Sequence, residues 1–348
     1  MSIETAAESV SGIRRWIAAW IVLALSISSV AGADSGNSIE LTVSSFFPPN
    51  HVQIRDVVAP WARNIERLSG GSVAVSIRTD AALGPAPTQF DLARDGVADI
   101  AIGLPAYTPG RFPLSSVFEL PFLVSDAESG SIVLWEIYRT HLQREYSDVK
   151  VLWMFVHGPG QLLTQKPVRT LEDLRGMKIR SPGPTMFRVL EKLGAVPVAA
   201  PMDRAYDMLI AGEVEGAVAP WEAVVPFRLH EQCGFATVLD LYTLPFFAVM
   251  NRRKYDALPP SIRKILDENS GESMAFRAGE AFDAAESAGK ALFLETGGRL
   301  SPLAPEEKQR WNRIAFGVGD DWAAEMNRRG LPGVEIIEAV TELLLQIQ

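Results

Sequence analysis

Residues 95–102 have the sequence Asp95-Gly96-Val97-Ala98-Asp99-Ile100-Ala101-Ile102, and a similar stretch occurs at Ala211-Gly212-Glu213-Val214-Glu215-Gly216-Ala217-Val218. Each stretch combines the end of a helical pattern, a glycine, an acidic residue and a short run of small apolar residues. Glycine permits the left-handed turn that ends a helix, and the apolar run is typical of a buried strand. Two such stretches predict two similar α/β lobes, with a chance likeness between two short, common units as the alternative.

The segments around both stretches alternate between strand and helix patterns, which predicts mostly parallel sheets with helices on their faces. Strands are expected at residues 39–44, 73–77, 98–103, 151–156 and 177–180. Helices are expected at residues 54–68, 88–95, 184–193 and 203–212. After Pro259-Pro260 the pattern is helical only, with helices expected at residues 261–296, 305–317, 320–328 and 334–346.

The composition is that of an ordinary globular protein. Of 348 residues, 47% are apolar and 22% are charged, and 42 acidic against 33 basic residues give a net charge of −9. Such a chain has no basic excess with which to neutralise a phosphate backbone, so nucleic acid is not expected as a partner. The single cysteine, Cys233, excludes an intramolecular disulfide, and the four histidines lack the spacing of metal ligands.

The N-terminus has the pattern of an export signal. Arg14-Arg15 precedes an apolar run from Trp16 to about Val30, and Ala31-Gly32-Ala33 follows. The run of about 15 residues is shorter than the ~20 that a membrane span needs. We expect residues 1–33 to be a signal peptide cleaved after about Ala33, with an uncleaved anchor as the alternative.

The sequence contains no motif that would indicate a cofactor or a catalytic nucleophile. Gly158-Pro159-Gly160 lacks the residues of a phosphate-binding loop, and we interpret it as a kinked connection between lobes. Arg180 is the most informative charged residue, because it ends a short apolar strand, where open α/β sheets bind ligands. Its planar guanidinium suits a carboxylate through two parallel hydrogen bonds. The alternative is an arginine at the surface or in an ion pair.

Several segments carry a resemblance to a known family. The most specific is Leu171-Glu172-Asp173-Leu174-Arg175-Gly176-Met177-Lys178-Ile179-Arg180. The others are the signal segment, Thr88-Gln89-Phe90-Asp91-Leu92 before Gly96, Arg111-Phe112-Pro113 and Leu120-Pro121-Phe122 within residues 107–122, and residues 206–216. Together they resemble, over about residues 39–300, the periplasmic solute-binding subunit of a TRAP transporter, of the DctP-type family.

The resemblance implies an α/β fold with two lobes, each a mostly parallel sheet flanked by helices, and a long C-terminal helix that bridges them. Lobe I would comprise residues 34–157 plus about 247–285, and lobe II residues 158–246 plus about 286–348. The lobes would close around one anion in the periplasm. Arg180 matches the arginine that pairs with the ligand carboxylate in that family.

Two departures from the family pattern concern the ligand. Members that bind acidic sugars have a second arginine in an N-G-x-R segment, where this chain has His157-Gly158-Pro159-Gly160. They also have an asparagine in D-G-x-x-N, where this chain has Glu215-Gly216-Ala217-Val218-Ala219. The expected site therefore has one carboxylate clamp, Arg180, and largely apolar or aromatic walls.

The residues expected to line that site fall into two groups. Apolar walls are expected from Leu104, Tyr107, Met202, Trp221 and Phe247, and polar contacts from Gln89, His157, Gln161 and Glu222. Each has a structural alternative: the apolar residues as core, Glu222 in an ion pair or loop hydrogen bond, and His157 as a support of the hinge.

The expected function is capture of an organic acid, a monocarboxylate with an apolar or aromatic body, for delivery to a TRAP-type membrane permease. A small 2-oxo acid or a C4-dicarboxylate is the alternative ligand. The alternative functions are an exported enzyme with Glu222 or His157 as general base, and a sensor subunit that presents its closed form to a receptor.

Overall fold

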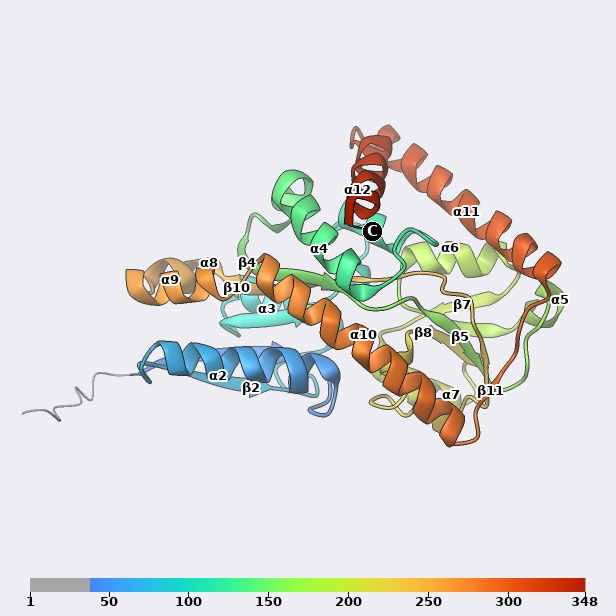
Figure 1. Ribbon diagram of the computed structural model, residues 1–348, viewed down its shortest axis with the longest axis horizontal. Helices are drawn as coiled ribbons and strands as arrows, with labels where there is room; N and C mark the ends of the chain where they lie inside the picture. The colour runs from blue at the N-terminus through green and yellow to red at the C-terminus, as the bar shows by residue number, and fades with distance from the viewer. Residues whose placement is uncertain (1–37, 348) are drawn as a thin grey trace, which may run out of the picture. The chain divides into compact units, whose positions relative to one another are not determined.

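Two mixed β-sheets with flanking helices form the part of the chain that the computed structural model describes, residues 38–347 (Figure 1). The predicted signal peptide, residues 1–33, lies outside these described residues. None of the helices between residues 38 and 347 has the length and apolar character of a membrane-spanning segment. The α/β class predicted from the two repeated stretches is confirmed, and the sheets differ from the expectation in one respect, their mixed strand direction.

The first sheet has five strands in the order β2-β1-β3-β10-β4. They are β1 (Ile39–Ser45), β2 (Val73–Arg78), β3 (Ile100–Gly103), β4 (Val149–Val156) and β10 (Pro245–Asn251). β1 pairs in parallel with β2 and β3, whereas β10 is antiparallel to both β3 and β4. The sheet is mixed because β10 returns to it from a distant part of the sequence.

The second sheet has six strands in the order β11-β9-β5-β8-β6-β7. They are β5 (Gln161–Thr164), β6 (Lys178–Ser181), β7 (Val196–Ala199), β8 (Gly216–Ala219), β9 (Phe235–Thr237) and β11 (Arg299–Leu300). β6 is parallel to β7 and β8, and β9 is parallel to β11. β5 is antiparallel to β8 and β9, so it joins the two parallel parts.

Both copies of the repeated stretch fold as predicted, one in each sheet. Gly96 ends α3 (Gln89–Asp95) with φ of 79°. Gly212, with φ of 68°, follows α7 (Ala205–Ile210) in the same way. Because this left-handed conformation favours glycine, the chain turns at both positions and continues into the buried strands β3 and β8.

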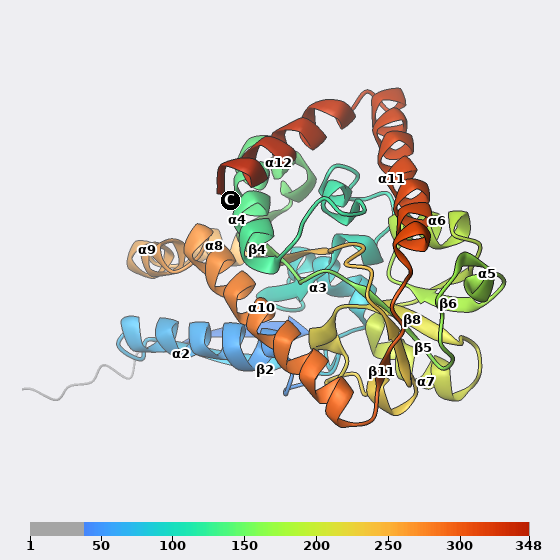
Figure 2. The same cartoon turned by 45° about the vertical axis from the view of Figure 1, so that its right-hand side comes forward.

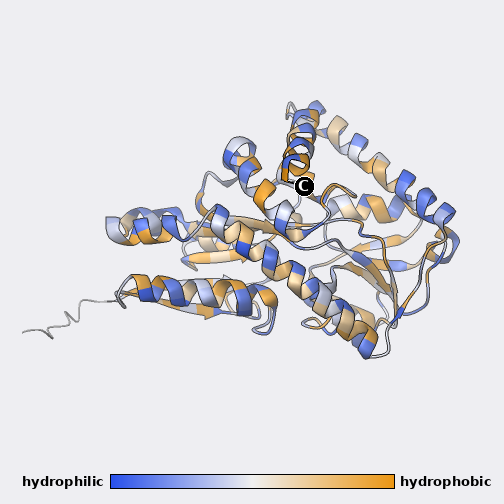
Figure 3. Ribbon diagram, in the orientation of Figure 1, coloured by the Kyte–Doolittle hydropathy of each residue, from blue (hydrophilic) through white to orange (hydrophobic). Residues whose placement is uncertain are grey.

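The helices cover the faces of the sheets. Before residue 260 the helices not yet named are α2 (Ala59–Leu68), preceded by a π-helical turn at Gln53–Val58, α4 (Ala127–Ile137), α5 (Leu171–Leu174), α6 (Pro184–Lys192) and α8 (Arg252–Ala257). Hydrophilic and hydrophobic residues mix along α2 and α10 (Figure 3), as expected for helices that bury one side and expose the other.

The C-terminal helices differ from the prediction at two places. The expected helix 261–296 is two helices, α9 (Pro260–Glu268) and α10 (Glu272–Glu295), because Gly271 between them has φ of 69° and ψ of −140°, which helical residues do not adopt. The helices expected at 305–317 and 320–328 are instead one, α11 (Pro305–Arg328). A glycine inside a helix costs only about 1 kcal/mol, so Gly317 and Gly319 do not interrupt it.

α10 is the bridging helix. It packs against α4 and β4 of the first sheet and against the 3₁₀ helix η9 (Trp221–Ala223), which follows β8 of the second sheet. Figures 1 and 2 show it running diagonally from the region of α4 toward α7 and β11. Two glycines of α10 allow this close contact. A Cβ added at Gly279 would lie 2.6 Å from the backbone oxygen of Ala127, and one added at Gly289 would lie 2.1 Å from the backbone oxygen of Trp221.

The last helix, α12 (Gly333–Ile347), packs against α4. Its buried residues Ile336, Val340 and Leu344 join an apolar cluster that includes residues of β4. The expected lobe boundaries, which assign residues 286–348 to lobe II, did not anticipate this contact with the first sheet's helix, and those boundaries remain a proposal.

Two segments that connect the sheets lie side by side. Residues 157–160 lead from β4 into β5, and residues 238–244 lead from β9 into β10. The Gly160 N–H donates to the backbone carbonyl oxygen of Tyr242 at 2.7 Å, and the Leu241 N–H donates to the backbone carbonyl oxygen of Gly160 at 3.0 Å. A Cβ at Gly160 would lie 2.2 Å from a ring carbon of Tyr242. Glycine at this position therefore makes room for the tyrosine ring.

Candidate functional site

A cavity lies beside these connecting segments, between residues that follow β1 and β3 of the first sheet and β8 of the second. About 330 Å³ of it, including space open to solvent, is free of protein atoms, and about 30 Å³ of that space is accessible to the centre of a water-sized sphere. Six of the ten residues predicted from the sequence line it: Leu104, Tyr107, His157, Arg180, Met202 and Glu222. The cavity therefore lies at the carboxyl ends of parallel strands, where open α/β sheets place their ligands.

Arg180 is the cavity's buried cation, with 1% of its surface exposed. Its Nε donates to the Ala200 oxygen at 2.8 Å and its Nη1 to the Val218 oxygen at 3.2 Å. Its Nη2 donates to the Tyr107 hydroxyl at 3.3 Å. All three acceptors are uncharged, and no carboxylate among residues 38–347 forms an ion pair with Arg180. A guanidinium has five N–H donors, so Arg180 keeps both a full charge and spare donors for an anion.

Tyr107 joins the two sides of the cavity. It ends the 3₁₀ helix η4 (Pro105–Tyr107), which follows β3 of the first sheet. Its hydroxyl accepts from Arg180 and, at 3.0 Å, from the backbone N–H of Met202, both of which belong to the second sheet's side. Burial raises the pKa of Tyr107, while the Arg180 charge acts in the opposite direction. The neutral hydroxyl also retains its own proton for donation.

Aromatic rings form much of the cavity wall. Phe46 and Phe47 follow β1, with ring centroids 4.1 Å apart, and Phe46 meets Tyr107 edge-on at 5.8 Å. Phe47 also packs against Phe227 at 6.4 Å and Phe246 at 5.9 Å. Such walls favour a ligand with apolar surface, because burying that surface contributes about 25 cal/mol per Å².

His51 and Glu222 form a buried pair on the same wall. Nε2 of His51 lies 2.9 Å from Oε2 of Glu222, and 0% and 3% of their side-chain surfaces are exposed. Nδ1 of His51 accepts the backbone N–H of Gln53 at 3.1 Å, so Nε2 carries the ring proton and faces the carboxylate. Glu222 therefore has a close internal partner, His51, and it lines the cavity as well.

His157 is held in a neutral state by its surroundings. Its Nδ1 contacts the Gly158 carbonyl oxygen, which is an acceptor, so the ring proton resides on Nδ1. Burial lowers the pKa of His157 to about 4, which keeps the ring uncharged at neutral pH. Its Nε2 is buried and has no hydrogen-bond partner among the described residues.

Two predicted polar contacts are used inside the protein and do not line the cavity. Gln89 accepts from the Ser44 hydroxyl and donates to the Gly84 oxygen, both at 2.8 Å. The Gln161 amide donates to the Pro159 oxygen and to Asp240, and accepts the backbone N–H groups of residues 239 and 240. Both amides are buried and satisfied by protein groups, so they stabilise loops.

Two predicted apolar residues also face elsewhere. The Trp221 ring packs on Phe293 of α10, with centroids 5.4 Å apart, and does not line the cavity. Phe247 packs in the other apolar cluster with Phe90 and Phe112. Because successive side chains of a strand point to opposite faces, its neighbour Phe246 lines the cavity instead.

The remaining lining residues were not predicted: Phe46, Phe47, His51, Pro220, Ala223, Phe227, Tyr242, Leu244 and Phe246. Phe46 and Phe47 had a usable signal, because they follow a strand that is parallel to its neighbours, as Arg180 does. Tyr242 had none, since it lies in an irregular segment whose position depends on Gly160.

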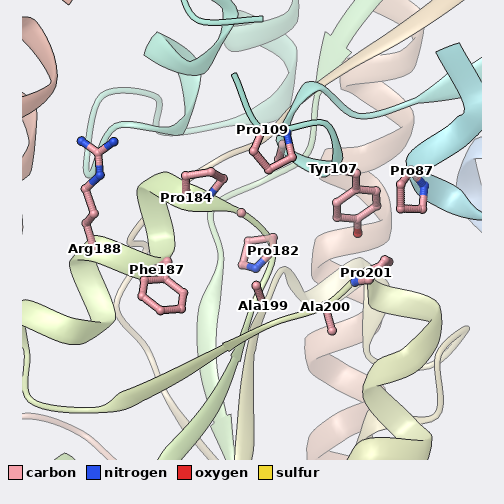
Figure 4. A pocket seen from close by; sticks show the side chains of 12 residues that line it. Pro87, Tyr107, Pro109, Pro182, Pro184, Phe187, Arg188, Ala199, Ala200 and Pro201 are labelled. Carbon is pink, nitrogen blue, oxygen red and sulfur yellow. The ribbon is translucent and has the colours of Figure 1, made fainter. Parts of the chain in front are cut away.

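A second depression lies outside Tyr107, with about 850 Å³ of open space. It is an apolar groove that contains the rings of Pro87, Pro109, Pro182, Pro184 and Pro201. Figure 4 shows Tyr107 beside Pro87 at one end, with its hydroxyl directed toward the segment of Ala200 and Pro201. The groove's one charged residue, Arg188, pairs with Glu325 at 2.6 Å. Of these two spaces, the inner cavity therefore offers a cation without a carboxylate partner among the described residues.

The described residues contain no group of acidic, histidine or cysteine side chains placed to hold a metal ion. Cys233 is buried, and burial raises the pKa of its thiol to about 12. A thiol with such a pKa is not a nucleophile at neutral pH.

Comparison with known families decides the identity of the fold. Residues 43–333 match the family DctP, described as "Bacterial extracellular solute-binding protein, family 7". The chain belongs to the DctP family. This confirms the resemblance drawn from residues 171–180, and the DctP fold accounts for the two sheets and the bridging helix.

Three solved structures of TRAP solute-binding proteins are similar to this DctP protein. One from Rhodoferax ferrireducens T118, in complex with copurified benzoate, is 35% identical, with a TM-score of 0.85, over 88% of this chain and 98% of that one. One from a marine metagenome, described as specific for aromatic acid ligands and bound to 3-hydroxybenzoate, is 35% identical, with a TM-score of 0.86, over 89% and 98%. One from Bordetella bronchiseptica, with bound (R)- and (S)-mandelate, is 30% identical, with a TM-score of 0.83, over 89% and 100%.

Proposed function

We propose that this protein binds an aromatic monocarboxylate in the cavity at Arg180 and delivers it, in the periplasm, to a TRAP-type membrane permease. The observation that carries the proposal is the buried guanidinium of Arg180, which lacks a carboxylate partner among the described residues and lies in an aromatic-lined cavity. The aromatic acids in the three similar structures support the same ligand class.

Each cavity group has a role in this proposal. Arg180 binds the carboxylate, and Tyr107 supplies a hydroxyl proton beside it. Phe46, Phe47, Phe246 and the apolar side chains of Leu104 and Met202 enclose the ligand body. The Glu222 carboxylate, in contact with His51, disfavours a second carboxylate. Contacts from both sides of the cavity stabilise the closed state, which the permease would recognise.

The charge of the cavity argues against the alternative dicarboxylate ligand. Arg180 is the one lysine or arginine that lines it, so a second carboxylate would be buried without a cation and beside Glu222. Burying an unpaired charge costs several kcal/mol. A sugar acid fits less well because its hydroxyl groups need polar partners, and most of the wall is apolar.

The same cavity gives no support to the alternative of an exported enzyme. We propose a binding protein without catalytic activity, since a nucleophile with its base does not occur among the cavity residues. A test is to incubate the protein with the bound acid for a day and to recover it for mass spectrometry. Recovery of the unchanged acid is expected, and a stoichiometric excess of product would overturn this part of the proposal.

The ligand class is tested by calorimetric titration of the purified mature protein with benzoate, 3-hydroxybenzoate, mandelate, succinate, pyruvate and glucuronate. The aromatic acids should bind and raise the melting temperature, because a ligand that binds only the folded state stabilises it. Tighter binding of succinate, pyruvate or glucuronate than of every aromatic acid would refute the proposed class. Mass spectrometry of the protein under native conditions would detect a copurified acid independently.

A further inference from the structure

Two polar atoms of the cavity belong neither to the carboxylate clamp nor to the His51–Glu222 contact. Nε2 of His157 and the hydroxyl of Tyr242 are both buried, and neither has a hydrogen-bond partner among residues 38–347. Both residues line the cavity, and 2% and 1% of their surfaces are exposed. Leaving a buried polar atom without a partner is unfavourable, so these two atoms are candidates for contact with a ligand.

The two atoms lie in one part of the cavity. The rings of His157 and Tyr242 are neighbours, with centroids 5.6 Å apart and planes at 88°. They come from the two connecting segments, which the Gly160 hydrogen bonds hold together. Arg180 comes instead from β6 of the second sheet. The cavity therefore has one cation that suits an anion, contributed by β6, and an uncharged pair contributed by the connecting segments.

The pair has a defined hydrogen-bonding character. Because the Nδ1 proton of His157 faces the Gly158 oxygen, its Nε2 offers only a lone pair and needs a donor. The low pKa of His157, about 4, maintains that state through the neutral range. The Tyr242 hydroxyl both donates and accepts. A group that donates to His157 and accepts from Tyr242 would satisfy both, and a hydroxyl is the simplest such group.

We infer that His157 and Tyr242 form a hydroxyl-recognition subsite, so that the protein selects hydroxylated aromatic monocarboxylates over their unsubstituted parents. The ligand hydroxyl donates to Nε2 of His157 and accepts from the Tyr242 hydroxyl, while Arg180 holds the carboxylate. This inference rests on the proposed function, because the hydroxyl belongs to the same ligand whose carboxylate Arg180 holds. It adds a preference within the class that the clamp and the aromatic walls do not by themselves produce.

The preference is tested first with the unaltered protein, so that no variant needs to fold. The dissociation constants of benzoate, the three hydroxybenzoate isomers and the three methoxybenzoate isomers are measured by calorimetry. At least one hydroxy isomer should bind about tenfold or more tightly than benzoate, since it satisfies a buried acceptor. Its methoxy counterpart, which accepts but cannot donate, should lose this advantage.

Two variants assign the preference to the pair. Tyr242→Phe removes the hydroxyl alone, and His157→Phe removes the acceptor and keeps a ring. In each variant the ratio of the benzoate to the hydroxybenzoate dissociation constant should fall toward one. Tyr138→Phe and His141→Phe, which alter residues outside the cavity, are the matched controls and should keep the ratio of the unaltered protein.

The outcomes separate this inference from the proposed function. If benzoate and the hydroxybenzoates bind with equal affinity, or if both variants keep the preference, the subsite is refuted while the aromatic-acid function stands. If no aromatic acid binds, the proposed function itself is refuted. Circular dichroism and melting curves of each variant show whether it is folded before the ratio is compared.

Discussion

Asp283 and Glu286 lie three residues apart on α10, and each carboxylate accepts two backbone N–H groups from a different side of the molecule. Asp283 accepts those of residues 127 and 128 at the start of α4, at 2.8 and 2.9 Å. Glu286 accepts those of residues 221 and 222 at η9, both at 3.0 Å. Residues three apart share one face of a helix, so one face of α10 holds the amino ends of two segments that belong to different sheets.

This arrangement predicts a pH-dependent stability. Burial, with a smaller contribution from the Glu222 charge, raises the pKa of Glu286 to about 8 from an ordinary value of 4.5. The folded protein therefore binds a proton more tightly than the unfolded chain does. The stability that Glu286 contributes is fully present below pH 4.5 and is lost as the pH rises through 8.

Glu286→Gln tests the pH prediction, because glutamine cannot lose a proton. Urea unfolding of the variant, measured at pH 5, 6, 7 and 8.5, should show a smaller loss of stability with pH than the unaltered protein. Glu280→Gln, at an exposed position of the same helix, is the control and should follow the unaltered protein. Parallel pH curves for all three proteins would contradict the assignment.

Two substitutions of Arg180 should weaken binding of the aromatic acid to different extents. Arg180→Gln removes the positive charge that would face the buried ligand carboxylate. The free energy of binding should weaken by about 3 kcal/mol or more. Arg180→Lys keeps the charge and loses the planar fork, so its affinity should lie between those of the glutamine variant and the unaltered protein. Calorimetry measures both, with Arg188→Lys, at the ion pair beside the outer groove, as the control.

Tyr107→Phe should shorten the lifetime of the complex. The variant loses the hydroxyl that accepts from Arg180 and from the Met202 backbone, so the closed state loses two contacts across the cavity. Hydrogen bonds of this kind contribute about 1 kcal/mol each. Stopped-flow measurement of ligand dissociation should show a rate increased by about tenfold. An unchanged dissociation rate would mean that Tyr107 is part of the wall only.

Phe246 and Phe247 provide a matched pair on one strand. Both are buried, with 3% and 2% of their surfaces exposed, but only Phe246 lines the cavity. Replacement of either phenylalanine by leucine should lower the free energy of unfolding by a similar amount, about 1–2 kcal/mol. Only Phe246→Leu should also change the relative affinities for benzoate and mandelate. Equal effects of both substitutions on ligand preference would refute the assigned faces of β10.

Gly160→Ala should displace Tyr242. The added methyl carbon would lie 2.2 Å from the tyrosine ring, and overpacking of this kind costs about 1–3 kcal/mol. Affinity for the aromatic acid should fall with stability, because Tyr242 lines the cavity. Gly317→Ala is the control: no atom outside its own helix lies within 4 Å of the new carbon, so denaturant unfolding should show equal or higher stability.

The features predicted well from sequence are those that local rules determine. The two Gly-containing stretches at residues 95–102 and 211–218 gave the two α/β units, because helix ends and buried strands have short-range patterns. Arg180 was found by the same logic, since it ends a strand. The breaks in the C-terminal helices were predicted less well, because a glycine either ends a helix or lies inside it, as Gly271 and Gly317 show.

The side chains of the cavity depend on longer-range information. In a pair such as Phe246-Phe247 both residues are apolar, so alternation cannot indicate which one faces the ligand. Gln89 and Gln161 have the chemistry of ligand contacts, but groups far away in sequence occupy them, the Ser44 hydroxyl at Gln89 and the Leu239 backbone N–H at Gln161. Tyr242 is placed by Gly160, and no periodicity in an irregular segment connects the two.

The surroundings of Arg180 also determine how the protein would behave in brine. Dissolved ions screen charges at a surface within about 8–10 Å at moderate ionic strength, but they reach a buried pair much less. With 1% of its surface exposed, the Arg180 guanidinium would attract a carboxylate at a place that mobile counter-ions screen weakly. Capture of the acid would then continue in fresh and in saline water alike, with little change in the concentration needed to fill the site.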